Sequence, residues 1–298
     1  MAGIQSEQRP ARRPKVRRVA FDRAKYGRDL LVDIAWVHDM PAFILDAPHS
    51  LDFFDIILVT RGRGSFLLDG VPHEMRRGQV FFSAPGRVRL WNVTGLDGIC
   101  LFFVDAFVRE FLQDATFVDR LPFFRADPAR AALQLGPPAV RQLRARLSRM
   151  RDELATFRRD SVDLLRAQLH ETLLVLARDY AVDHDVAPSR AVHPTVARFL
   201  ALVERYATER HRVEEYASEL AVTPGYLSVL CAQATGMTAK RYIESAVTIR
   251  ARRLLLYTDE PAARIAAKLG FDDPSYFARF FRRESGQSPS KFRAASKR

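Results

Sequence analysis

Short apolar runs separated by turn residues fill the chain from about residue 34 to residue 107. The runs include FFDIILVTRG, GSFLLDG, GQVFFSAPG, VRLWNV and GICLFFV, and glycine stands at the breaks between them. Strands of this length joined by tight turns are typical of antiparallel β-sandwiches and β-barrels. The pattern therefore predicts that this part of the chain is an all-β domain.

Two apolar stripes with helical spacing follow the predicted β domain. Apolar residues three or four positions apart lie on one face of a helix, and a break near residues 158–161 divides the stripes. The sequence therefore predicts an α-helical hairpin within residues 121–180. Two heptads are too few to establish a coiled coil, so the stripes either cover the β domain or form the interface of a homodimer. The stripes are Leu143, Leu147, Met150, Leu154 and Phe157, then Leu165, Leu169, Leu173 and Leu176.

One pattern occurs twice in the last hundred residues. Residues 213–243 and 262–293 align with each other at an offset of 49 or 50 positions. In each copy a polar residue followed by proline starts the second helix and a glycine ends it: Thr223-Pro224 with Gly236, and Asp273-Pro274 with Gly286. Each copy is thus predicted to be a helix-turn-helix motif, whose second helix enters the major groove of DNA.

A continuous helix is predicted between the two copies, over residues 238–258, because this segment contains no helix breaker. About 19 helical residues span roughly 28 Å at 1.5 Å per residue. This length is close to the ~34 Å that separates successive major-groove faces on one side of a duplex. A single chain can therefore place two recognition helices in adjacent grooves.

The second helix of the second copy combines an apolar stripe with a basic surface. Phe277 and Phe281 are predicted to be buried, whereas Ser275 and Arg279 share another face near the helix N-terminus, where base edges are usually reached. Arginine can bind guanine O6 and N7 through two hydrogen bonds. We expect the other cations of the region to contact phosphates without reading sequence: Arg250, Arg252, Arg253, Arg282, Arg283, Lys291 and Arg293.

Basic residues gather at the two ends of the chain, which has a net charge of +12 at pH 7. Residues 1–30 contain nine Lys or Arg against three acids, residues 31–190 contain 20 against 21, and residues 191–298 contain 18 against 11. A near-neutral middle with a basic C-terminal third is typical of a nucleic-acid-binding module attached to a domain with another role. Residues 1–28 have little apolar periodicity and are predicted to be a flexible basic arm.

The sequence indicates neither export nor membrane insertion. No apolar run approaches the roughly 20 residues of a membrane span, and no apolar signal segment follows the basic N-terminus, so we expect a cytoplasmic protein. The two cysteines, Cys100 and Cys231, are too far apart in sequence for a short-spaced thiolate metal site and are expected to be buried thiols.

The C-terminal region resembles the AraC/XylS family of bacterial transcription regulators over about residues 194–296. The resemblance is closest over AARIAAKLGFDDPSYFARFFRRESGQSPSKFR. The resemblance implies two lobes that read a bipartite DNA site. By position, it implies base-reading roles for Ser275, Tyr276 and Arg279 in the second lobe and for Gly225, Ser228 and Val229 in the first. Relatives often carry arginine where this chain has Val229, and valine cannot form the two hydrogen bonds to guanine. We therefore expect the first lobe to contribute less to affinity.

The N-terminal half resembles the cupin-type sensor domain of many such regulators, chiefly over DFFDIILVTRGRGSFLLDGVPHEMRRGQVFFSAPGRVRLW. Enzymatic cupins bind a metal through paired histidines and a carboxylate, but this segment lacks the histidine pair, so neither a metal nor another cofactor is expected. Polar and aromatic residues near the predicted strand ends are candidates for binding a small-molecule effector: His38, His49, Arg87, Arg89 and Trp91. The two arginines would suit a carboxylate.

Together these patterns predict a two-domain α+β protein. Its parts are a basic arm at 1–28, a cupin-like antiparallel β-barrel at 29–120, an α-hairpin at 121–180, a linker at 181–193 and an AraC-type DNA-binding domain at 194–298. The predicted function is sequence-specific transcriptional regulation, by activation or repression. The expected partners are double-stranded DNA, a small-molecule effector, RNA polymerase and a second copy of the chain.

Two other classes of function are weighed against this interpretation. A nonspecific or architectural DNA-binding protein would depend more on the basic arm than on the recognition helices, and sequence preference separates the two. An enzyme with an appended DNA-binding domain is disfavoured because the sequence contains no glycine-rich phosphate loop and no nucleophile elbow, and too few cysteines for a thiolate zinc site. No catalytic residue is predicted.

Overall fold

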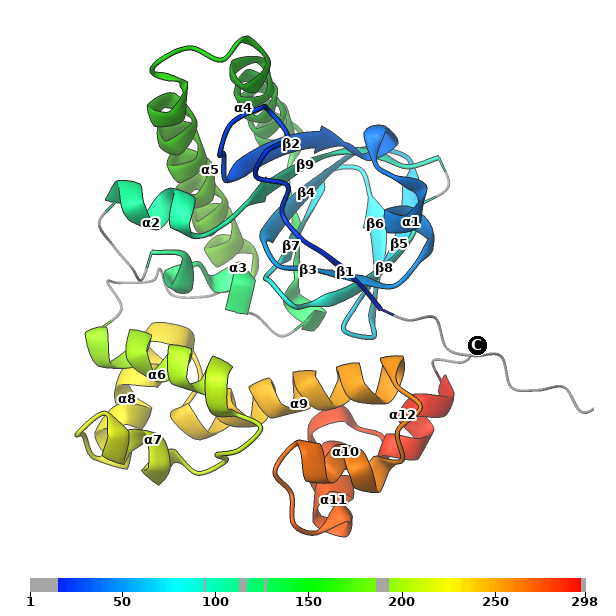
Figure 1. Cartoon of the computed structure of the whole chain (residues 1–298), viewed down its shortest axis with the longest axis vertical. Coiled ribbons are helices and arrows are strands. Elements are labelled where there is room, and N and C mark those ends of the chain that lie inside the picture. The colour runs from blue at the N-terminus through cyan, green and yellow to red at the C-terminus, as the bar shows by residue number, and fades with distance from the viewer. Residues whose placement is uncertain (1–15, 94, 113–116, 126–127, 186–192, 296–298) are drawn as a thin grey trace, which may run out of the picture.

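The computed structural model describes residues 16–93, 95–112, 117–125, 128–185 and 193–295. Figure 1 shows a β domain with a helical hairpin along one side, above a helical C-terminal domain. The predicted fold class, a β-rich N-terminal domain followed by a helical domain with two helix-turn-helix motifs, is confirmed.

The β domain consists of two five-stranded sheets that enclose an apolar core. The first sheet has the order β1 (Arg17–Val19), β3 (His49–Leu51), β8 (Val88–Asn92), β5 (Arg63–Leu68) and β6 (Val71–Arg76). The second has the order β10 (Ala132–Gln134), β7 (Gln79–Ser83), β4 (Phe54–Arg61), β9 (Asp97–Phe103) and β2 (Val32–Trp36). The paired strands run antiparallel except β1 and β3, which are parallel. Phe66, Phe81 and Trp91 are buried between the sheets.

The N-terminal segment corrects one prediction. Residues 16–28 do not form a flexible arm, because β1 extends the first sheet and the Phe21 ring packs edge-on against Phe53 with 5.1 Å between centroids. The rest of the predicted arm, residues 1–15, lies outside the described residues. Aromatic burial thus anchors a segment whose sequence is dominated by charge.

Short helical segments lie between the strands, and those of only four or five residues cannot show helical periodicity in the sequence. Helix α1 packs against β8, and α2 and α3 pack against the hairpin. Their bounds are α1 (Ala42–Asp46), α2 (Ala106–Leu112) and α3 (Pro122–Arg125), with 3₁₀ turns η1 (Val37–Asp39), η2 (Val118–Arg120) and η3 (Pro128–Arg130).

The hairpin consists of α4 (Pro137–Thr156) and α5 (Ser161–Asp183), so the second helix extends three residues into the predicted linker. Of the two stripes, Phe157 is partly buried and the other eight residues are buried in one core with Ile56, Leu58 and Phe82 of the β domain. The stripes therefore cover the β domain. A homodimer would have to use other faces of these helices.

The C-terminal domain starts with α6 (Pro194–Tyr206) and then contains both motifs. The first consists of α7 (Val213–Glu219) and α8 (Pro224–Thr235), and the second of α10 (Ala262–Lys268) and α11 (Pro274–Ser285). Between them runs the connector α9 (Ala239–Tyr257), which has the 19 residues expected, and α12 (Pro289–Ala295) ends the described chain. The predicted caps are confirmed: Thr223 and Asp273 accept backbone hydrogen bonds at the starts of α8 and α11, and Gly236 and Gly286 end them in the left-handed conformation.

The cysteines and the hydropathy of the helices were also considered in the sequence. Both cysteines, Cys100 and Cys231, are buried free thiols, as predicted. Among the described residues, no helix has the combination of length and apolar content that crossing a membrane requires.

Candidate nucleic-acid interface and ligand cavity

Helix α11 has one exposed polar face, and its opposite face is buried in the core of the C-terminal domain. Phe277, Phe280 and Phe281 are buried against the neighbouring helices, which fixes the rotation of α11 about its axis. Ser275, Tyr276 and Arg279 are exposed in its first half, and the Arg279 side chain is 71% exposed. The Arg279 guanidinium lies 5.9 Å from the centroid of the Tyr276 ring and 3.8 Å from the carboxylate of Asp273. The three predicted residues therefore share one accessible face.

Helix α8 presents the corresponding face in the first motif, with a different chemistry. Gly225 and Val229 are exposed and Ser228 is half-buried. Tyr226, which is 48% exposed, lies beside them but was not among the predicted base-reading residues. Its alignment with Tyr276 was the signal that could have identified it. The face has no cation, so it suits contact with thymine methyl groups better than with guanine.

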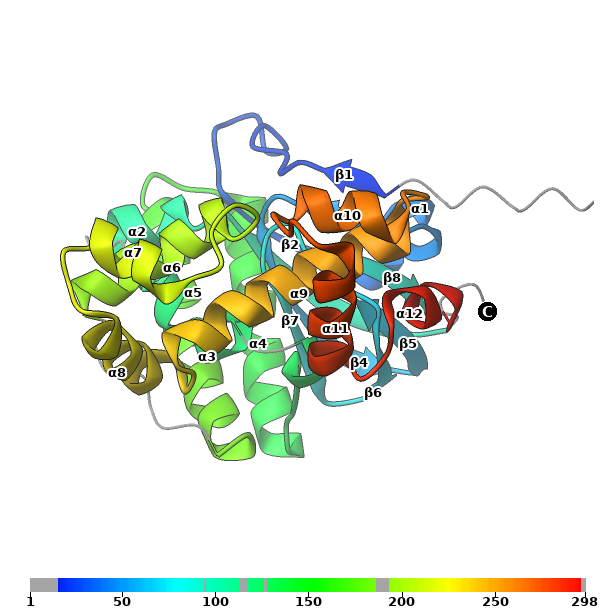
Figure 2. The same ribbon diagram turned by 90° about the horizontal axis from the view of Figure 1, so that it is seen from below.

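The connector α9 joins the two motifs. Figure 2 looks onto the C-terminal domain with the β domain behind it, and shows α8 beside one end of α9 and α11 crossing α9 further along. Ion pairs tie α9 to α11: Arg283 Nη2 lies 2.8 Å from Glu244, and Arg241 Nη1 lies 2.7 Å from Glu284. These contacts fix α11 relative to α9.

The predicted phosphate-binding residues fall into two groups. Arg282, Arg283 and Lys291 are exposed, and Arg252 is half-buried. Arg283 also pairs with Glu244, but its side chain is 55% exposed. The remaining three are held by contacts within the protein. Arg293 donates hydrogen bonds to the backbone carbonyls of Leu255 and Glu260, Arg250 donates to the backbone carbonyl of Glu204, and Arg253 donates to the carboxylate of Asp69. These three arginines are therefore weaker candidates for phosphate contact.

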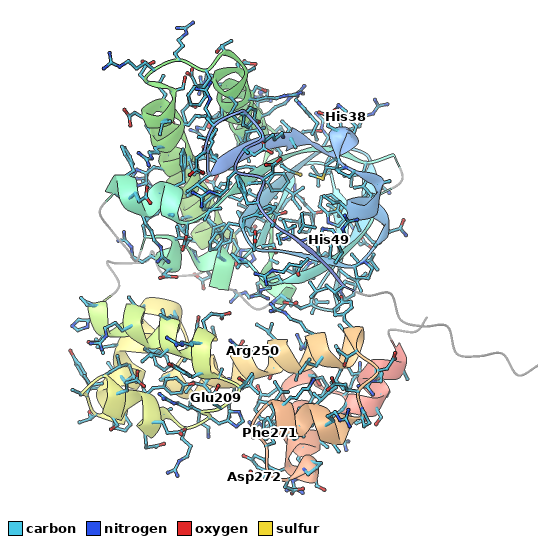
Figure 3. The ribbon with its side chains drawn as sticks, viewed as in Figure 1. His38, His49, Glu209, Arg250, Phe271 and Asp272 are labelled. Atoms are coloured by element: carbon cyan, nitrogen blue, oxygen red, sulfur yellow. The ribbon has the colours of Figure 1, made fainter. Side chains whose placement is uncertain are left out.

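Arg250 and Arg253 face the β domain instead of the outer surface of α9. Both line a cleft of ≈ 530 Å³ between the two domains, and Figure 3 shows Arg250 on the side of the C-terminal domain that faces the barrel. The spacing of arginines along a helix could not reveal this, because the sequence does not show which face of α9 meets the other domain.

A second, smaller cavity of ≈ 250 Å³ lies in the β domain and brings together three of the five predicted ligand-binding residues, His49, Arg89 and Trp91. The other two lie elsewhere: the exposed His38 stacks on Trp36, and Arg87 pairs with Asp69 at 3.2 Å. Figure 3 shows His38 at the upper end of the barrel, away from His49. Aromatic and aliphatic side chains supply much of the remaining wall: Phe21, Phe53, Phe102, Met40, Ile44 and Leu51.

Buried polar groups line this cavity. The Arg89 guanidinium is buried, is paired with Asp55 and donates a 2.8 Å hydrogen bond to Ser83 Oγ. Burial raises the pKa of Asp55, and the charge of Arg89 opposes that rise. Burial lowers the pKa of His49 to about 4, so this imidazole is neutral at pH 7.

Three buried polar atoms of the lining residues have no hydrogen-bond partner within the described part of the chain: Asp55 Oδ1, Arg89 Nε and Trp91 Nε1. Buried polar atoms are normally paired, so these atoms mark an incompletely satisfied polar cluster in the wall of the cavity. The lining has two cationic residues, Lys25 and Arg89, against four aspartates at positions 22, 33, 39 and 55. Because Asp55 already neutralises Arg89, the cavity suits an uncharged ligand better than the carboxylate expected from the sequence.

Where the structure describes the chain, no group of three or more His, Cys, Asp or Glu side chains is arranged to hold a metal ion.

Comparison with known proteins supports this division of roles. The model of the AraC-like ligand-binding domain matches residues 41–174, and a helix-turn-helix domain model matches residues 216–295. The HTH-type transcriptional activator RhaS of Citrobacter koseri is 30% identical over 260 residues, which cover 82% of this chain and 86% of RhaS. The HTH-type transcriptional activator RhaR of Klebsiella pneumoniae is 27% identical over 259 residues, which cover 84% of this chain and 88% of RhaR.

Among solved structures, the DNA-binding domain of AdpA in complex with a target DNA is 25% identical, with a TM-score of 0.33, and covers 35% of this chain and 95% of that domain. The family models match the β domain with most of its hairpin and most of the C-terminal helical domain, and RhaS aligns with most of the chain. The chain therefore belongs to the AraC family of transcriptional regulators.

Proposed function

We propose that this protein is a transcriptional activator that reads a bipartite site on double-stranded DNA and responds to a small molecule held in the β domain. The observation that carries the proposal is the pair of exposed faces on α8 and α11, each fixed by a buried opposite side and joined by the 19-residue α9. Two such helices on one rigid connector suit adjacent major grooves.

The two lobes contribute unequally in this proposal. Arg279 supplies the guanine contact in the second half-site, supported by Ser275 and Tyr276. Gly225, Tyr226, Ser228 and Val229 read the first half-site through shape and apolar contact. Arg252, Arg282, Arg283 and Lys291 contact phosphates and set the register of the protein on the duplex.

The β-domain cavity is the proposed effector site. Trp91, Arg89 and Asp55 supply polar parts of the wall around the effector, while Phe21, Phe53 and Phe102 cover its apolar part. Few polar groups in a mainly apolar cavity are typical of small-molecule sites. The excess of aspartates in the lining disfavours an anionic effector.

The relatives RhaS and RhaR are named transcriptional activators, which supports recruitment of RNA polymerase and positive control for this chain. Pairing of two chains remains part of the proposal. The leucine stripes are buried within the protomer, so the dimer contact belongs on an exposed face of the hairpin, where Leu164 and Leu174 of α5 are 43% and 39% exposed.

The direct test is selection of bound sequences from a random duplex pool by the full-length protein at about 150 mM salt. Two short motifs about one helical turn apart are expected in the enriched DNA, and the same selection with Arg279→Ala should lose preference in one motif only. Tight, salt-sensitive binding without enrichment would instead support the nonspecific, architectural function. An uncharged compound that sharpens enrichment would identify the effector class.

A further inference from the structure

Asp69 connects the two domains through one buried carboxylate. It lies in the turn between β5 and β6, has a φ of 48° and is fully buried. Arg253 of α9 donates from Nε to Asp69 Oδ1 at 2.7 Å and from Nη2 to Oδ2 at 3.3 Å. Arg87 Nη1 donates to Asp69 Oδ2 at 3.2 Å from within the β domain. A buried carboxylate held by two guanidinium groups is a strong, geometrically defined contact.

Apolar packing surrounds this ion pair. Leu256, one turn further along α9, lies so close to Gly70 that a Cβ at that glycine would come within 2.4 Å of Leu256 Cδ1. Tyr257 packs nearby, and burial together with the charge of Asp69 raises its pKa. The turn that contains Asp69 and Gly70 is thus fitted to the last turns of the connector, and the Asp69 side chain is fully buried there while Arg253 remains 24% exposed.

Strand β8 connects the same carboxylate to the cavity. At the start of β8, the Val88 amide donates to Asp69 Oδ1 at 3.0 Å, and the Asp69 amide donates to the Val88 carbonyl at 2.8 Å. Further along β8, Arg89 and Trp91 line the cavity. Arg89 also pairs with Leu68, the residue before Asp69, across the sheet. Strand β8 therefore links the wall of the cavity to the Asp69 carboxylate through direct hydrogen bonds.

We propose that Asp69 and Arg253 form a latch that fixes the DNA-binding domain on the sensor domain and that strand β8 lets the occupancy of the cavity control this latch. The inference rests on the proposed function of the cavity as an effector site. The reading faces of α8 and α11 stay exposed while the latch is closed, so the latch controls the orientation of α9 and does not cover the DNA-binding surface. Control by orientation requires that an effector favour one arrangement of the domains over the other.

The docking part of the proposal is tested with full-length Asp69→Asn, Arg253→Gln and the double variant, measured by small-angle X-ray scattering. Each single variant should increase the radius of gyration, and the double variant should add little, because both remove one shared contact. Arg252→Gln is the matched control, since it removes the same charge from the neighbouring position of α9. Arg253→Gln keeps the test valid if Asp69→Asn disturbs the β domain. An unchanged radius of gyration in Arg253→Gln would overturn the latch.

The coupling between the contact and the cavity is tested by changing the C-terminal domain and measuring the response in the β domain. The chain has two tryptophans, so a Trp36→Phe background leaves Trp91 as the reporter of the cavity. Adding Arg253→Gln, which alters only the C-terminal domain, should shift the Trp91 emission and speed hydrogen exchange at the Val88 amide by about tenfold, because a hydrogen bond to the charged Asp69 is loosened. Linkage requires that a cavity able to act on α9 also respond to α9.

The domains could separate while Trp91 emission and hydrogen exchange at the Val88 amide stay unchanged. The contact would then hold the two domains together without linking α9 to the cavity, and the proposed control by the cavity would be wrong. Neither measurement uses DNA or an effector. Failure of the latch would therefore leave the DNA-reading proposal standing, and failure of the DNA selection would leave the latch standing.

Discussion

Replacing Arg279 with alanine tests the assignment of base reading most directly, because the structure separates its role in DNA binding from its role in the fold. The side chain is 71% exposed, and its contacts with Asp273 and Tyr276 are long, at 3.8 Å and 5.9 Å. The helix cap does not depend on it, since Asp273 Oδ1 accepts from the Ser275 amide at 2.7 Å. We expect the free energy of unfolding to change by less than about 0.5 kcal/mol.

The effect on DNA should be much larger. A bidentate arginine–guanine contact is worth about 1 to 3 kcal/mol of discrimination, which corresponds to a roughly 5- to 160-fold loss of affinity for the selected site. Fluorescence anisotropy would compare the selected duplex, the same duplex with one base pair changed, and a scrambled duplex. Arg279→Lys keeps the charge but not the paired donors, so it should lose the preference as well.

Arg282→Ala is the matched control on the same helix. It is expected to weaken all three duplexes alike and to lower the slope of log affinity against log salt concentration by about 0.9, as the loss of one phosphate contact does. Equal losses on selected and scrambled DNA for Arg279→Ala would refute the assignment and place this arginine among the phosphate contacts.

Three further predictions address the first lobe, the hairpin and the cavity. Val229→Arg should add a guanine preference to the first half-site, visible as a new base in the selection experiment, and an unchanged first motif would show that α8 does not reach base edges there. Leu169→Ala should lower the free energy of unfolding in urea by about 2 to 5 kcal/mol because Leu169 is fully buried, whereas Leu174→Ala on the exposed side of α5 should cost less than about 1 kcal/mol. The pKa of His49 falls from 6.5 in the unfolded chain to about 4 in the fold, so the unfolded state binds the extra proton and stability declines from about pH 6.5 to pH 4. His49→Gln should remove about 3 kcal/mol of that decline, and a pH profile equal to that of the unsubstituted protein would contradict a neutral, buried His49.

Local chemistry made the C-terminal domain predictable from its sequence. Thr223, Asp273, Gly236 and Gly286 specify helix ends through their own side chains or their lack of one, so neighbouring residues suffice to place α8 and α11. The buried face of α11 followed from helical periodicity for the same reason.

Contacts between distant residues were beyond the same reasoning. Arg253 looks like a solvated cation on an amphipathic helix, and only the fold brings it to Asp69, 184 positions away. Arg89 looks like a free carboxylate receptor until Asp55 is placed beside it. Residues 16–28 were predicted to be flexible because they are rich in charge and have little apolar periodicity. The parallel pairing of β1 with β3 leaves no local signal in the sequence.

In the proposed function, the rigid connector restricts the promoters that this protein can regulate. Because Arg283–Glu244 and Arg241–Glu284 tie α11 to α9, the gap between the half-sites is set by protein geometry. Inserting one base pair into that gap would shift the second half-site by about 3.4 Å and rotate it by about 35° around the duplex, given roughly 10 base pairs per turn. A genome can therefore be searched for target operons with the spacer length held constant and only the bases of the two half-sites allowed to vary.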